Sequence, residues 1–339
     1  MQDQNELVMN LGSGLEERVN DFVPTTFDDY LGQKKLKEKI TVYTQAAKMR
    51  SESLDHMLLF GPPGLGKTTL ATIMAHVMEV NIKICSGPML ERTGDLVAIL
   101  SSLESRDILF IDEIHRMPIA VEEVMYSAME QFCVDVIIGQ GAGAQSVNVP
   151  LNAFTLIGAT TKSGSISAPL RSRFGITERL DFYESDSLQQ IVQQSCGFLG
   201  ITISGDGALA IAQCSRGTPR IAKKIVRRVR DFAQIRGTSS ISTDLTNEAL
   251  IFLGIDSDGL CRLDNMILEK LLAHFGGGPA GLETIASMLG EDKETIETVY
   301  EPFLMRKGYL ERTPRGRQIP QSAVPYLTKK YCGQQGFLD

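Results

Sequence analysis

Apolar and polar positions follow three different patterns along the 339-residue chain. Residues 28–50 predict an amphipathic helix, because apolar side chains recur there at helical spacing. These side chains are Leu31, Leu36, Ile40, Tyr43 and Ala47. Between residues 56 and 183, short apolar runs alternate with helical stretches, which is typical of βαβ units and a mostly parallel sheet. From residue 184 the strand pattern stops, and segments broken at glycine or proline predict an all-helical lid.

The pattern changes again at the Asp- and Gly-rich stretch 252–262, which predicts a linker. The chain after it has the order helix, turn, helix, short strand and loop, and this order predicts a winged helix-turn-helix. We therefore expect three domains. They are an α/β domain over 1–183 with helices on both faces of a parallel sheet, a small helical lid over 184–255, and a winged-helix domain over 256–339.

Charge is distributed unevenly along the chain. The formal net charge is −7, which argues against a protein that coats nucleic acid over its whole surface. Seven basic and no acidic residues lie between residues 216 and 230, and from residue 301 onward seven basic residues face three acidic ones, a local net charge of +4. Any contact with phosphate is therefore expected to be local.

Composition also bears on the compartment. No run of about 20 apolar residues could span a bilayer, and the N-terminal residues lack the basic and then apolar order of a secretion signal. The six cysteines lie far apart, without a CxxC pair or a histidine spacing suited to zinc. We therefore expect a cytoplasmic protein with reduced thiols.

The strongest chemical signal is the stretch LLFGPPGLGKTTL, where Gly61 begins a G-x-x-x-x-G-K-[ST] pattern between a predicted strand and a predicted helix. The glycines let backbone N–H groups turn inward around phosphate, and the helix N-terminus adds positive potential. We expect Lys67 to reach the terminal phosphates of ATP and Thr68 to bind Mg²⁺. A chance glycine-rich turn is the alternative, and the acidic strand downstream argues against it.

That strand, DILFIDE, ends in two carboxylates. Asp112 is placed to hold Mg²⁺ through its water shell, and Glu113 to polarise an attacking water. Buried acids at a strand end are costly unless a metal or another positive charge compensates them. Glu113 favours a hydrolase over a small-molecule kinase, which would not need a water-activating base here.

A third strand, FTLIGATT, ends in Thr160 and Thr161. Their hydroxyls either sense the γ-phosphate and orient the water, or the two residues are simply strand formers.

The loop APLRSRFG, which follows that strand, carries Arg171 and Arg173 with no acidic residue beside them. An arginine at the molecule's edge that must meet a phosphate is most simply a finger supplied to a neighbouring subunit. An ordinary surface salt bridge is the alternative. In the lid, Arg220 follows a proline in RGTPRIAKK, and we expect it to touch the γ-phosphate in cis.

These motifs in this order resemble AAA+ ATPases. The stretches HMLLFGPPGLGKTTLA, LFIDEIHRM, FTLIGATTKSG and PLRSRFGI are closer still to the RuvB family of Holliday junction branch migration motors, over about residues 30–317. The resemblance implies an ATP hydrolase that forms a hexameric ring on duplex DNA and drives branch migration in homologous recombination and DNA repair. It also implies that Arg173 is the finger and Arg220 the lid sensor.

The resemblance further implies a set of nucleotide contacts. The set is Phe22, Val23, Gly64, Gly66, Lys67, Thr68, Thr69, Glu130, Gln131, Phe132, Thr161, Arg173, Tyr183 and Arg220. The family usually has Arg-Pro where this chain has Val23-Pro24, so we expect this segment to contact adenine only by packing. Lys162 stands where arginine is common, which keeps the charge.

An insertion, CVDVIIGQGAGAQSVNVPL, predicts a β-hairpin with a glycine-rich tip near residues 134–150. Exposed Val136, Ile137 and Ile138 would form an apolar patch that needs a partner, and a purely structural hairpin is the alternative. The resemblance implies that the hairpin docks the junction-recognising protein RuvA, with the junction resolvase RuvC in a larger complex.

The predicted second helix of the winged domain is acidic. Its carboxylates are Glu291, Asp292, Glu294, Glu297 and Glu301. They would repel DNA phosphate, so a recognition helix in the major groove is not expected.

The wing, ERTPRGRQ, offers Arg312, Arg315 and Arg317 to a DNA backbone. We assign DNA contacts to Arg312, Arg317 and Lys293, mostly to phosphate and with little sequence preference. A protein-interaction module is the alternative for this domain.

Two rival functions remain open. A clamp-loader or replication-initiator ATPase would share the ATP chemistry and can carry a winged helix. A nucleotide-gated binding switch would hydrolyse too slowly to do work, and Glu113 and Arg173 argue against it.

Overall fold

The computed structural model describes residues 22–138 and 145–332. The chain forms two compact units. One comprises Met1–Gly200 with Thr218–Lys224, and the other Ile201–Gly217 with Ile225–Asp339. In the described ranges, no helix has the length and apolar character needed to cross a membrane.

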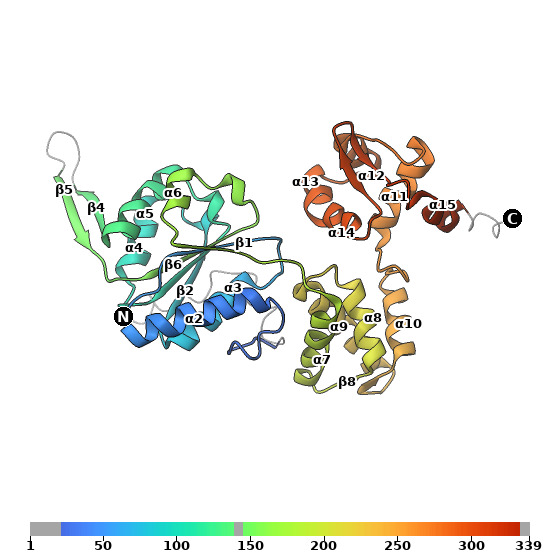
Figure 1. The fold of residues 1–339 in the computed structure, drawn as a ribbon, viewed down its shortest axis with the longest axis horizontal. Coiled ribbons are helices and arrows are strands. Elements are labelled where there is room, and N and C mark those ends of the chain that lie inside the picture. The colour runs from blue at the N-terminus through green and yellow to red at the C-terminus, as the bar shows by residue number, and fades with distance from the viewer. Residues whose placement is uncertain (1–21, 139–144, 333–339) are drawn as a thin grey trace. The chain divides into compact units, whose positions relative to one another are not determined.

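A five-stranded sheet forms the centre of the first unit, in the order β2-β3-β6-β1-β7, and every neighbouring pair is parallel (Figure 1). The strands are β1 (Met57–Phe60), β2 (Ile82–Ser86), β3 (Ile108–Asp112), β6 (Thr155–Thr160) and β7 (Ile176–Arg179). Phe60 is in register with Thr160, and Ser86 with Asp112. Because the strands are parallel, their carboxyl ends share one edge, and the polar motifs of the sequence meet there. The predicted parallel sheet is confirmed.

Helices lie on both faces of this sheet, with α2 and α3 on one face and α4, α5 and α6 on the other (Figure 1). The helices of this unit are α2 (Lys34–Arg50), α3 (Lys67–Met78), α4 (Thr93–Ser101), α5 (Ile119–Gln131), α6 (Ala168–Ser172) and α7 (Ser185–Phe198), with short 3-10 turns at Gly87–Met89, Ile114–Arg116 and Ser163–Ser165. The predicted first helix is slightly misphased. Thr44 is buried and donates to the Ile40 carbonyl at 2.8 Å, whereas Tyr43 is exposed.

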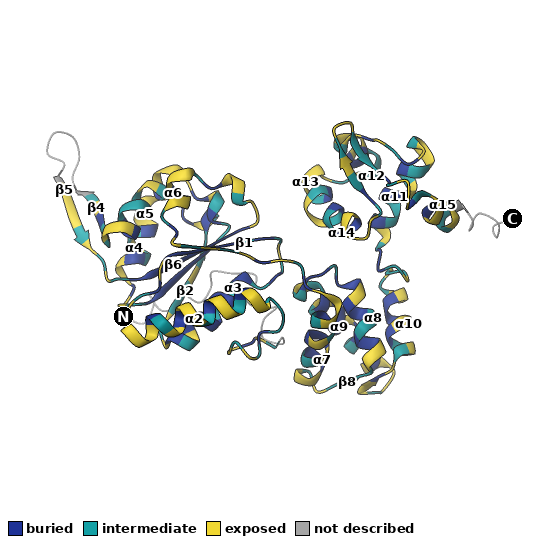
Figure 2. Cartoon of the chain, viewed as in Figure 1, coloured by how far each residue is buried: buried dark blue, intermediate teal, exposed yellow. Residues whose placement is uncertain are grey.

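The core between sheet and helices is mostly apolar. All six residues of β6 are buried, and Phe110 and Phe154 are among the largest fully buried side chains. Figure 2 shows the central strands dark and the helices buried along one side only. This two-sided burial explains why β1, β3 and β6 are nearly continuous apolar runs, whereas the less buried β7 alternates.

The predicted hairpin is present. β4 (Cys133–Ile138) and β5 (Gln145–Pro150) pair antiparallel, with Val136 opposite Val147. Val134 is buried at the base, Val136 is half-buried and Val147 is exposed. The tip, 139–144, and the side chains of Ile137 and Ile138 lie outside the described residues.

The second unit holds most of the lid and the winged helix. Its helices are α8 (Gly205–Cys214), α9 (Pro219–Ile235, whose first residues belong to the first unit), α10 (Thr243–Phe252), α11 (Arg262–Phe275), α12 (Leu282–Leu289), α13 (Lys293–Thr295), α14 (Glu301–Arg306) and α15 (Val324–Cys332). The lid also contains a two-residue parallel ladder, β8 (Thr202–Ile203) with β9 (Ser240–Ile241), which the helix pattern did not predict. The wing is the antiparallel pair β10 (Glu311–Thr313) and β11 (Gly316–Gln318).

The second helix of the winged domain is not a regular α-helix. A single π-helical turn, Ile296–Tyr300, separates α13 from α14. Pro302 follows it, and a proline has no N–H to complete the hydrogen-bond ladder. One carbonyl of the preceding turn is therefore left without its helical N–H partner.

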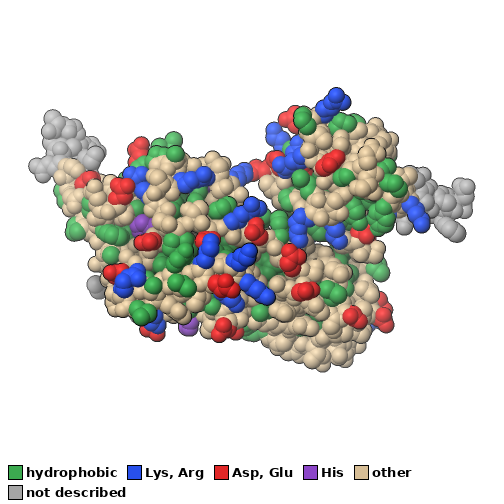
Figure 3. All heavy atoms as spheres, in the orientation of Figure 1, with side chains coloured by type: hydrophobic (Ala, Val, Ile, Leu, Met, Phe, Trp, Pro, Cys, Tyr) green, Lys and Arg blue, Asp and Glu red, His purple; other side chains and the backbone are tan. Residues whose placement is uncertain are grey.

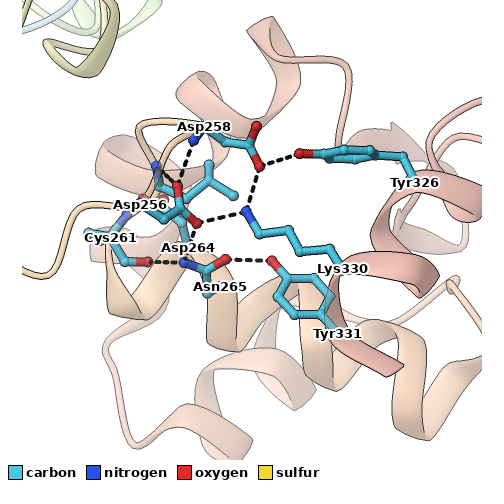
Figure 4. Close-up of polar contacts among 9 residues, drawn as sticks. Asp256, Asp258, Cys261, Asp264, Asn265, Tyr326, Lys330 and Tyr331 are labelled. Carbon is cyan, nitrogen blue, oxygen red and sulfur yellow. Dashed lines mark hydrogen bonds and ion pairs between the residues drawn. The ribbon is translucent and has the colours of Figure 1, made fainter. Parts of the chain in front are cut away.

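The predicted linker between lid and winged helix is fixed in place by the C-terminal helix (Figure 4). Lys330 of α15 donates to Asp256 at 2.7 Å and to Asp258 at 2.5 Å, and the Tyr326 hydroxyl donates to Asp258 at 2.6 Å. The linker is thus part of the winged-helix domain and is not a loose tether.

Candidate active site

The loop after β1 has the form of a phosphate cradle. Gly61, Gly64 and Gly66 all have positive φ angles, 142°, 78° and 96°. A Cβ at Gly61 would stand 2.4 Å from the Leu180 carbonyl oxygen, so no larger residue fits without displacing backbone. Only glycine therefore satisfies both the conformation and the space at the start of this loop.

Lys67 begins α3 and folds back over the loop. Its ammonium donates to the carbonyl oxygens of Gly61 at 2.8 Å and Pro62 at 3.0 Å. Burial lowers the pKa of Lys67, and the nearby Asp112 carboxylate opposes that shift. The positive charge is thus partly desolvated and held beside the loop by neutral acceptors, which suits a phosphate ligand.

The acidic pair lies at the end of β3. Asp112 accepts the amide of Glu113 through Oδ1 at 2.9 Å, and Glu113 has a φ of 48°, which turns its side chain off the strand. The Glu113 carboxylate is paired with Arg116 at 2.9 Å. In the described part of the chain, no group of three or more His, Cys, Asp or Glu side chains is arranged to hold a metal ion.

The two threonines of β6 have different surroundings. Thr160 is fully buried, and its hydroxyl lies 3.0 Å from Nδ1 of His115 and accepts the amide of Lys162 at 3.0 Å. Burial lowers the pKa of His115, although Glu113 opposes that shift. Thr161 is exposed at the end of the strand. The hydroxyl of Thr160 therefore connects β6 with the turn after Glu113, while Thr161 is the threonine open to a ligand.

Two tyrosines support the loop from behind. The hydroxyls of Tyr183 and Tyr30 lie 3.2 and 3.4 Å from the carbonyl oxygen of Leu65, and 3.2 Å from each other. Burial raises the pKa of Tyr183 to about 12. Tyr183 was expected at the nucleotide, whereas Tyr30 was missed. The sequence signal was weak, since Tyr30 stands in a polar stretch before the first helix.

Arg220 reaches the same loop. Its amide donates to the Gly64 carbonyl at 3.4 Å, and a Cβ at Gly64 would stand 2.9 Å from Cβ of Arg220. Near it, Lys223 donates to the carbonyl of Phe22, whose ring lies 5.9 Å from that of Phe198. Val23 is 44% exposed. The predicted lid arginine and the N-terminal segment thus both lie in the unit that carries the P-loop.

Arg173 and Arg171 have separate partners. The guanidinium of Arg173 lies 4.4 Å from the ring centre of Tyr126, within 3.2 Å of the Glu130 carboxylate, and donates to the Pro169 carbonyl at 2.7 Å. Arg171 donates to the Ser163 carbonyl instead. No acidic residue is adjacent to Arg173 in the sequence, but Glu130 of α5 lies beside it in the folded chain.

The residues at the C-terminal end of α5 have different surroundings. Glu130 and Gln131 are exposed, but Phe132, with a φ of 48°, packs its ring against His56 and Phe154 at centroid distances of 6.2 and 5.9 Å. Phe132 thus fixes the end of α5 in the core, and Glu130 and Gln131 are the residues open to a ligand.

Comparisons with known proteins agree over most of the chain. Three family models match: the Holliday junction DNA helicase RuvB P-loop domain over residues 22–180, the RuvB AAA lid domain over 183–256 and the RuvB C-terminal winged helix domain over 257–328. The chain belongs to the RuvB family. It is therefore an ATP-driven motor that binds nucleotide and acts on Holliday junction DNA. The predicted order of P-loop domain, lid and winged helix is confirmed.

Solved RuvB structures from Thermotoga maritima are similar over nearly their full length. The RuvB Holliday junction branch migration motor of that organism is 45% identical, with a TM-score of 0.80 over 90% of this chain and 98% of that one. Two single-site mutants of it give 45% identity with TM-scores of 0.82 and 0.81, covering 91% and 90% of this chain and 99% and 97% of theirs.

The wing of this RuvB-family chain is less open to DNA than its sequence suggested. Glu301 is fully buried and accepts from Arg312 at 2.7 Å and from Arg317 at 2.6 Å, while Glu297 lies 3.4 and 3.5 Å from the same two arginines. Of the two arginines, Arg312 keeps 45% of its side chain exposed and Arg317 only 17%. Glu301 therefore does not face DNA, contrary to expectation, because it is the counter-charge of the wing.

The other basic groups of the winged domain lie at the surface. Arg315, between the two strands of the wing, is exposed. Lys293 is exposed and forms a surface ion pair with Glu283 at 3.3 Å. On the face drawn in Figure 3, lysines and arginines are interspersed with acidic side chains and do not form one continuous basic field.

Proposed function

We propose that this chain assembles into a hexameric ring on duplex DNA and drives branch migration of Holliday junctions during homologous recombination and DNA repair. The observation that carries the proposal is the position of Arg173. Its guanidinium is held by α5 and α6, through Tyr126, Glu130 and the Pro169 carbonyl, and its ion pair and hydrogen bond go to these helices. In this proposal the guanidinium gives up its contact with Glu130 and meets a phosphate that a second copy of the chain presents.

The chemistry at the sheet edge follows from the residues gathered there. Lys67 would hold the terminal phosphates of the substrate ATP, and Thr68 and Asp112 would hold Mg²⁺, which neutralises phosphate charge when bound. Glu113 would orient the attacking water, while Arg173 of the neighbouring copy would stabilise charge on the transferred group. Arg220 would report the state of the γ-phosphate to the lid.

The rest of the nucleotide site is proposed from resemblance and placement together. The proposed contacts are Phe22, Val23, Gly64, Gly66, Thr69, Glu130, Gln131, Phe132, Thr161 and Tyr183. Support is strongest for Gly64 and Tyr183, which lie at the P-loop itself. For Phe132 the role would be indirect, since its ring packs in the core.

Partners, compartment and boundaries complete the proposal. The hairpin 134–150 would dock RuvA, supported by exposed Val147, with RuvC in a larger complex. Lys293, Arg312 and Arg317 would contact DNA phosphate, in the cytoplasm. Domain boundaries at 183/184 and 255/256 are supported by the limits of the family models, within a few residues.

The direct test is ATP-dependent dissociation of a synthetic four-way junction, with and without a junction-binding partner. We expect dissociation that requires ATP and rises with the partner. ATP hydrolysis without dissociation of any junction would contradict the motor function and favour a loader-type ATPase.

The subunit arrangement has its own test, in mixed assemblies. Arg173→Ala chains that still bind ATP should depress hydrolysis by more than their share when mixed with the unmodified chain, because each one disables a neighbour's site. Arg171→Ala, whose side chain is bonded to the Ser163 carbonyl, is the matched control and should act only in proportion. Equal effects of the two variants would place the finger in this loop without assigning it to Arg173.

A further inference from the structure

The turn between α8 and α9 of the lid is held by the winged helix. Arg216 stands in this turn with a φ of 52°, and Gly217 follows with 73°. A positive φ is uncommon for a residue with a side chain and persists only where surrounding contacts fix it. The side chain of Arg216 enters the winged-helix domain, and only 12% of it remains exposed.

Inside that domain the guanidinium meets the start of α11. Nη2 of Arg216 donates to Oδ2 of Asp264 at 2.5 Å and to Sγ of Cys261 at 3.0 Å. Asp264 is fully buried and also accepts the amide of Cys261 at 2.8 Å, which caps the helix. Burial raises the pKa of Asp264 and the charge of Arg216 opposes the rise. A lid residue thus supplies the counter-charge for a buried acid of the winged helix.

The same guanidinium also contacts the π-helical turn. Nη1 of Arg216 donates to the Val299 carbonyl at 3.3 Å, and the guanidinium lies 5.2 and 5.0 Å from the ring centres of Tyr300 and Phe303. The Val299 carbonyl of this turn thus accepts a donor from the lid, outside its own helix. The planar guanidinium can donate at its edge and stack on rings with its face, which a lysine cannot do.

The main chain of the turn is held as well. Nη1 of Arg306, in α14, donates to the Arg216 carbonyl at 3.1 Å. A Cβ at Gly217 would stand 1.9 Å from that same nitrogen. Gly217 is the residue with the most backbone freedom in the turn, but it is packed beneath the Arg306 side chain of the winged helix. This packing restricts rotation of the backbone at Gly217.

The chain leaves this turn directly toward the nucleotide loop. Arg220, four positions after Arg216, donates its amide to the Gly64 carbonyl of the P-loop. Four residues span at most about 14 Å when fully extended. A contact with the winged helix and a contact with the P-loop are thus only four positions apart in the sequence.

We propose that Arg216 is the positioning residue that makes the winged helix follow the lid, so that a change sensed at Arg220 moves the DNA-binding domain. This rests on the motor function proposed above. Arg216 touches neither nucleotide nor DNA in this role, and it acts by holding Asp264 and the π-helical turn.

The experiment measures, for the full-length protein, junctions dissociated per ATP hydrolysed. The double variant Arg216→Met/Asp264→Asn removes the ion pair without leaving a buried charge. Coupling between sites commonly amounts to a factor of about 5–150, so we expect junctions per ATP to fall about tenfold while ATP turnover stays within about twofold. Arg216→Lys keeps the charge but loses the forked donor geometry and the stacking on the rings. Its number of junctions dissociated per ATP should lie between that of the unmodified chain and that of the double variant. This variant still tests the proposal if the double variant folds poorly.

Arg236→Met is the matched control. Arg236 pairs with Glu248 at 2.9 Å and lies 5.4 Å from the Phe232 ring centre, so it makes the same kinds of contact within the lid alone. It should leave junctions per ATP unchanged. An unchanged ratio in both Arg216 variants would overturn the proposal.

A second readout separates this proposal from the motor function. Amide hydrogen exchange in α11 should differ between the ADP-bound and ATP-analogue-bound protein, and this difference should vanish in the Arg216 variants but persist in Arg236→Met. If the unmodified chain dissociates no junction, the motor function fails and the exchange data still decide the role of Arg216. A nucleotide-dependent difference that survives in the Arg216 variants would refute it.

Discussion

The P-loop and the wing place positive charge in opposite ways. At the P-loop, the Lys67 ammonium donates to two main-chain carbonyls, so its charge is available to a phosphate. At the wing, Arg312 and Arg317 converge on the fully buried carboxylate of Glu301. Basic residues were predicted to bind phosphate in both places. At the P-loop, the charge of Lys67 is preorganised for a ligand, whereas at the wing Glu301 compensates much of the arginine charge.

The difference follows from what fixes each charge. The P-loop lysine is positioned by its own neighbours in sequence, where glycines determine the path of the backbone. The wing arginines are positioned by Glu301, a residue 11 and 16 positions away on the preceding helix. Phosphate contact at the wing would therefore use whatever charge Glu301 leaves uncompensated, together with the exposed Arg315.

The largest expected effect is on the nucleotide side of the comparison. Glu113→Gln should lower ATP turnover by about a hundredfold to ten-thousandfold, the range of general acid–base contributions, while ATP binding persists. Steady-state hydrolysis and nucleotide binding measured on the same preparation would check this.

The control for Glu113 is its ion-pair partner. Arg116→Ala removes a surface pair, worth about 1 kcal/mol at most, and should change turnover by no more than about fivefold. Turnover that is insensitive to Glu113→Gln would mean that the carboxylate has no part in hydrolysis.

On the wing side, Glu301→Gln should reduce stability. Removing one partner of a buried ion pair leaves the others uncompensated, which typically costs about 3–5 kcal/mol. Thermal unfolding of the winged domain, followed by hydrogen exchange in α14, would report the loss. Glu297→Gln is the matched control, since Glu297 touches the same arginines but is 44% exposed, and it should cost about 1 kcal/mol or less. Equal losses would mean that Glu301 is not the centre of the wing.

The fold, and the gathering of the P-loop and the acidic pair at one edge of the sheet, were predictable from the sequence. The motifs that could be placed, the P-loop and the acids after β3, combine a fixed backbone path with a strand or helix that has a clear apolar pattern. Parallel strands then bring their carboxyl ends together without further information.

Contacts between distant segments were not predictable. The local sequence around Arg173 gave no acid, although Glu130 lies beside it in space. Glu301 was counted among surface acids because a helical pattern alone does not show which of five carboxylates is buried. The contacts of Tyr30 with the P-loop and of Arg216 with the winged helix were missed for the same reason, since their partners stand 35 and 48 positions away.

A smaller effect is expected where α5 supports the finger. Tyr126→Leu removes the ring beneath Arg173, and a cation–π contact at a partly exposed site is worth about 0.5–1 kcal/mol, or about twofold to fivefold in turnover. Tyr126→Phe keeps the ring and loses only the hydroxyl, which donates to Glu122 at 2.6 Å. Turnover should therefore fall less in the Phe variant than in the Leu variant. Identical losses would assign the effect to the hydroxyl and not to the ring.

Substitutions of Arg315 and Arg312 should differ in their effects on the salt dependence of DNA binding and on stability. Arg315→Ala should reduce the slope of log affinity against log salt by about 1 and leave stability unchanged, as expected for a phosphate contact at the surface. Arg312→Ala should instead lower stability as well, because it leaves Glu301 with one fewer partner. Fluorescence anisotropy on duplex DNA at several salt concentrations, with thermal unfolding of the same samples, distinguishes the two. Loss of stability in Arg315→Ala would contradict its placement at the surface.

The smallest effect concerns a buried histidine behind the nucleotide site. His56 accepts the amide of Leu156 through Nδ1 at 2.9 Å, and its Nε2 lies 3.0 Å from the Met129 carbonyl. This arrangement requires the neutral ring, and burial lowers the pKa of His56 below its ordinary value of 6.5. The unfolded chain therefore binds more protons than the folded one below about pH 6.5, so stability should fall as the pH drops from there through the folded pKa.

His115, whose pKa burial also lowers, contributes in the same direction, so a local readout is needed to isolate His56. Protonation of His56 removes the acceptor of the Leu156 amide, and exchange of that amide should accelerate as the pH falls below about 6.5, beyond the intrinsic trend. His56→Gln should weaken protection of Leu156 at every pH but abolish the extra acceleration. An unchanged pH profile in that variant would mean that another group, and not His56, controls the opening of β6 beside the P-loop strand.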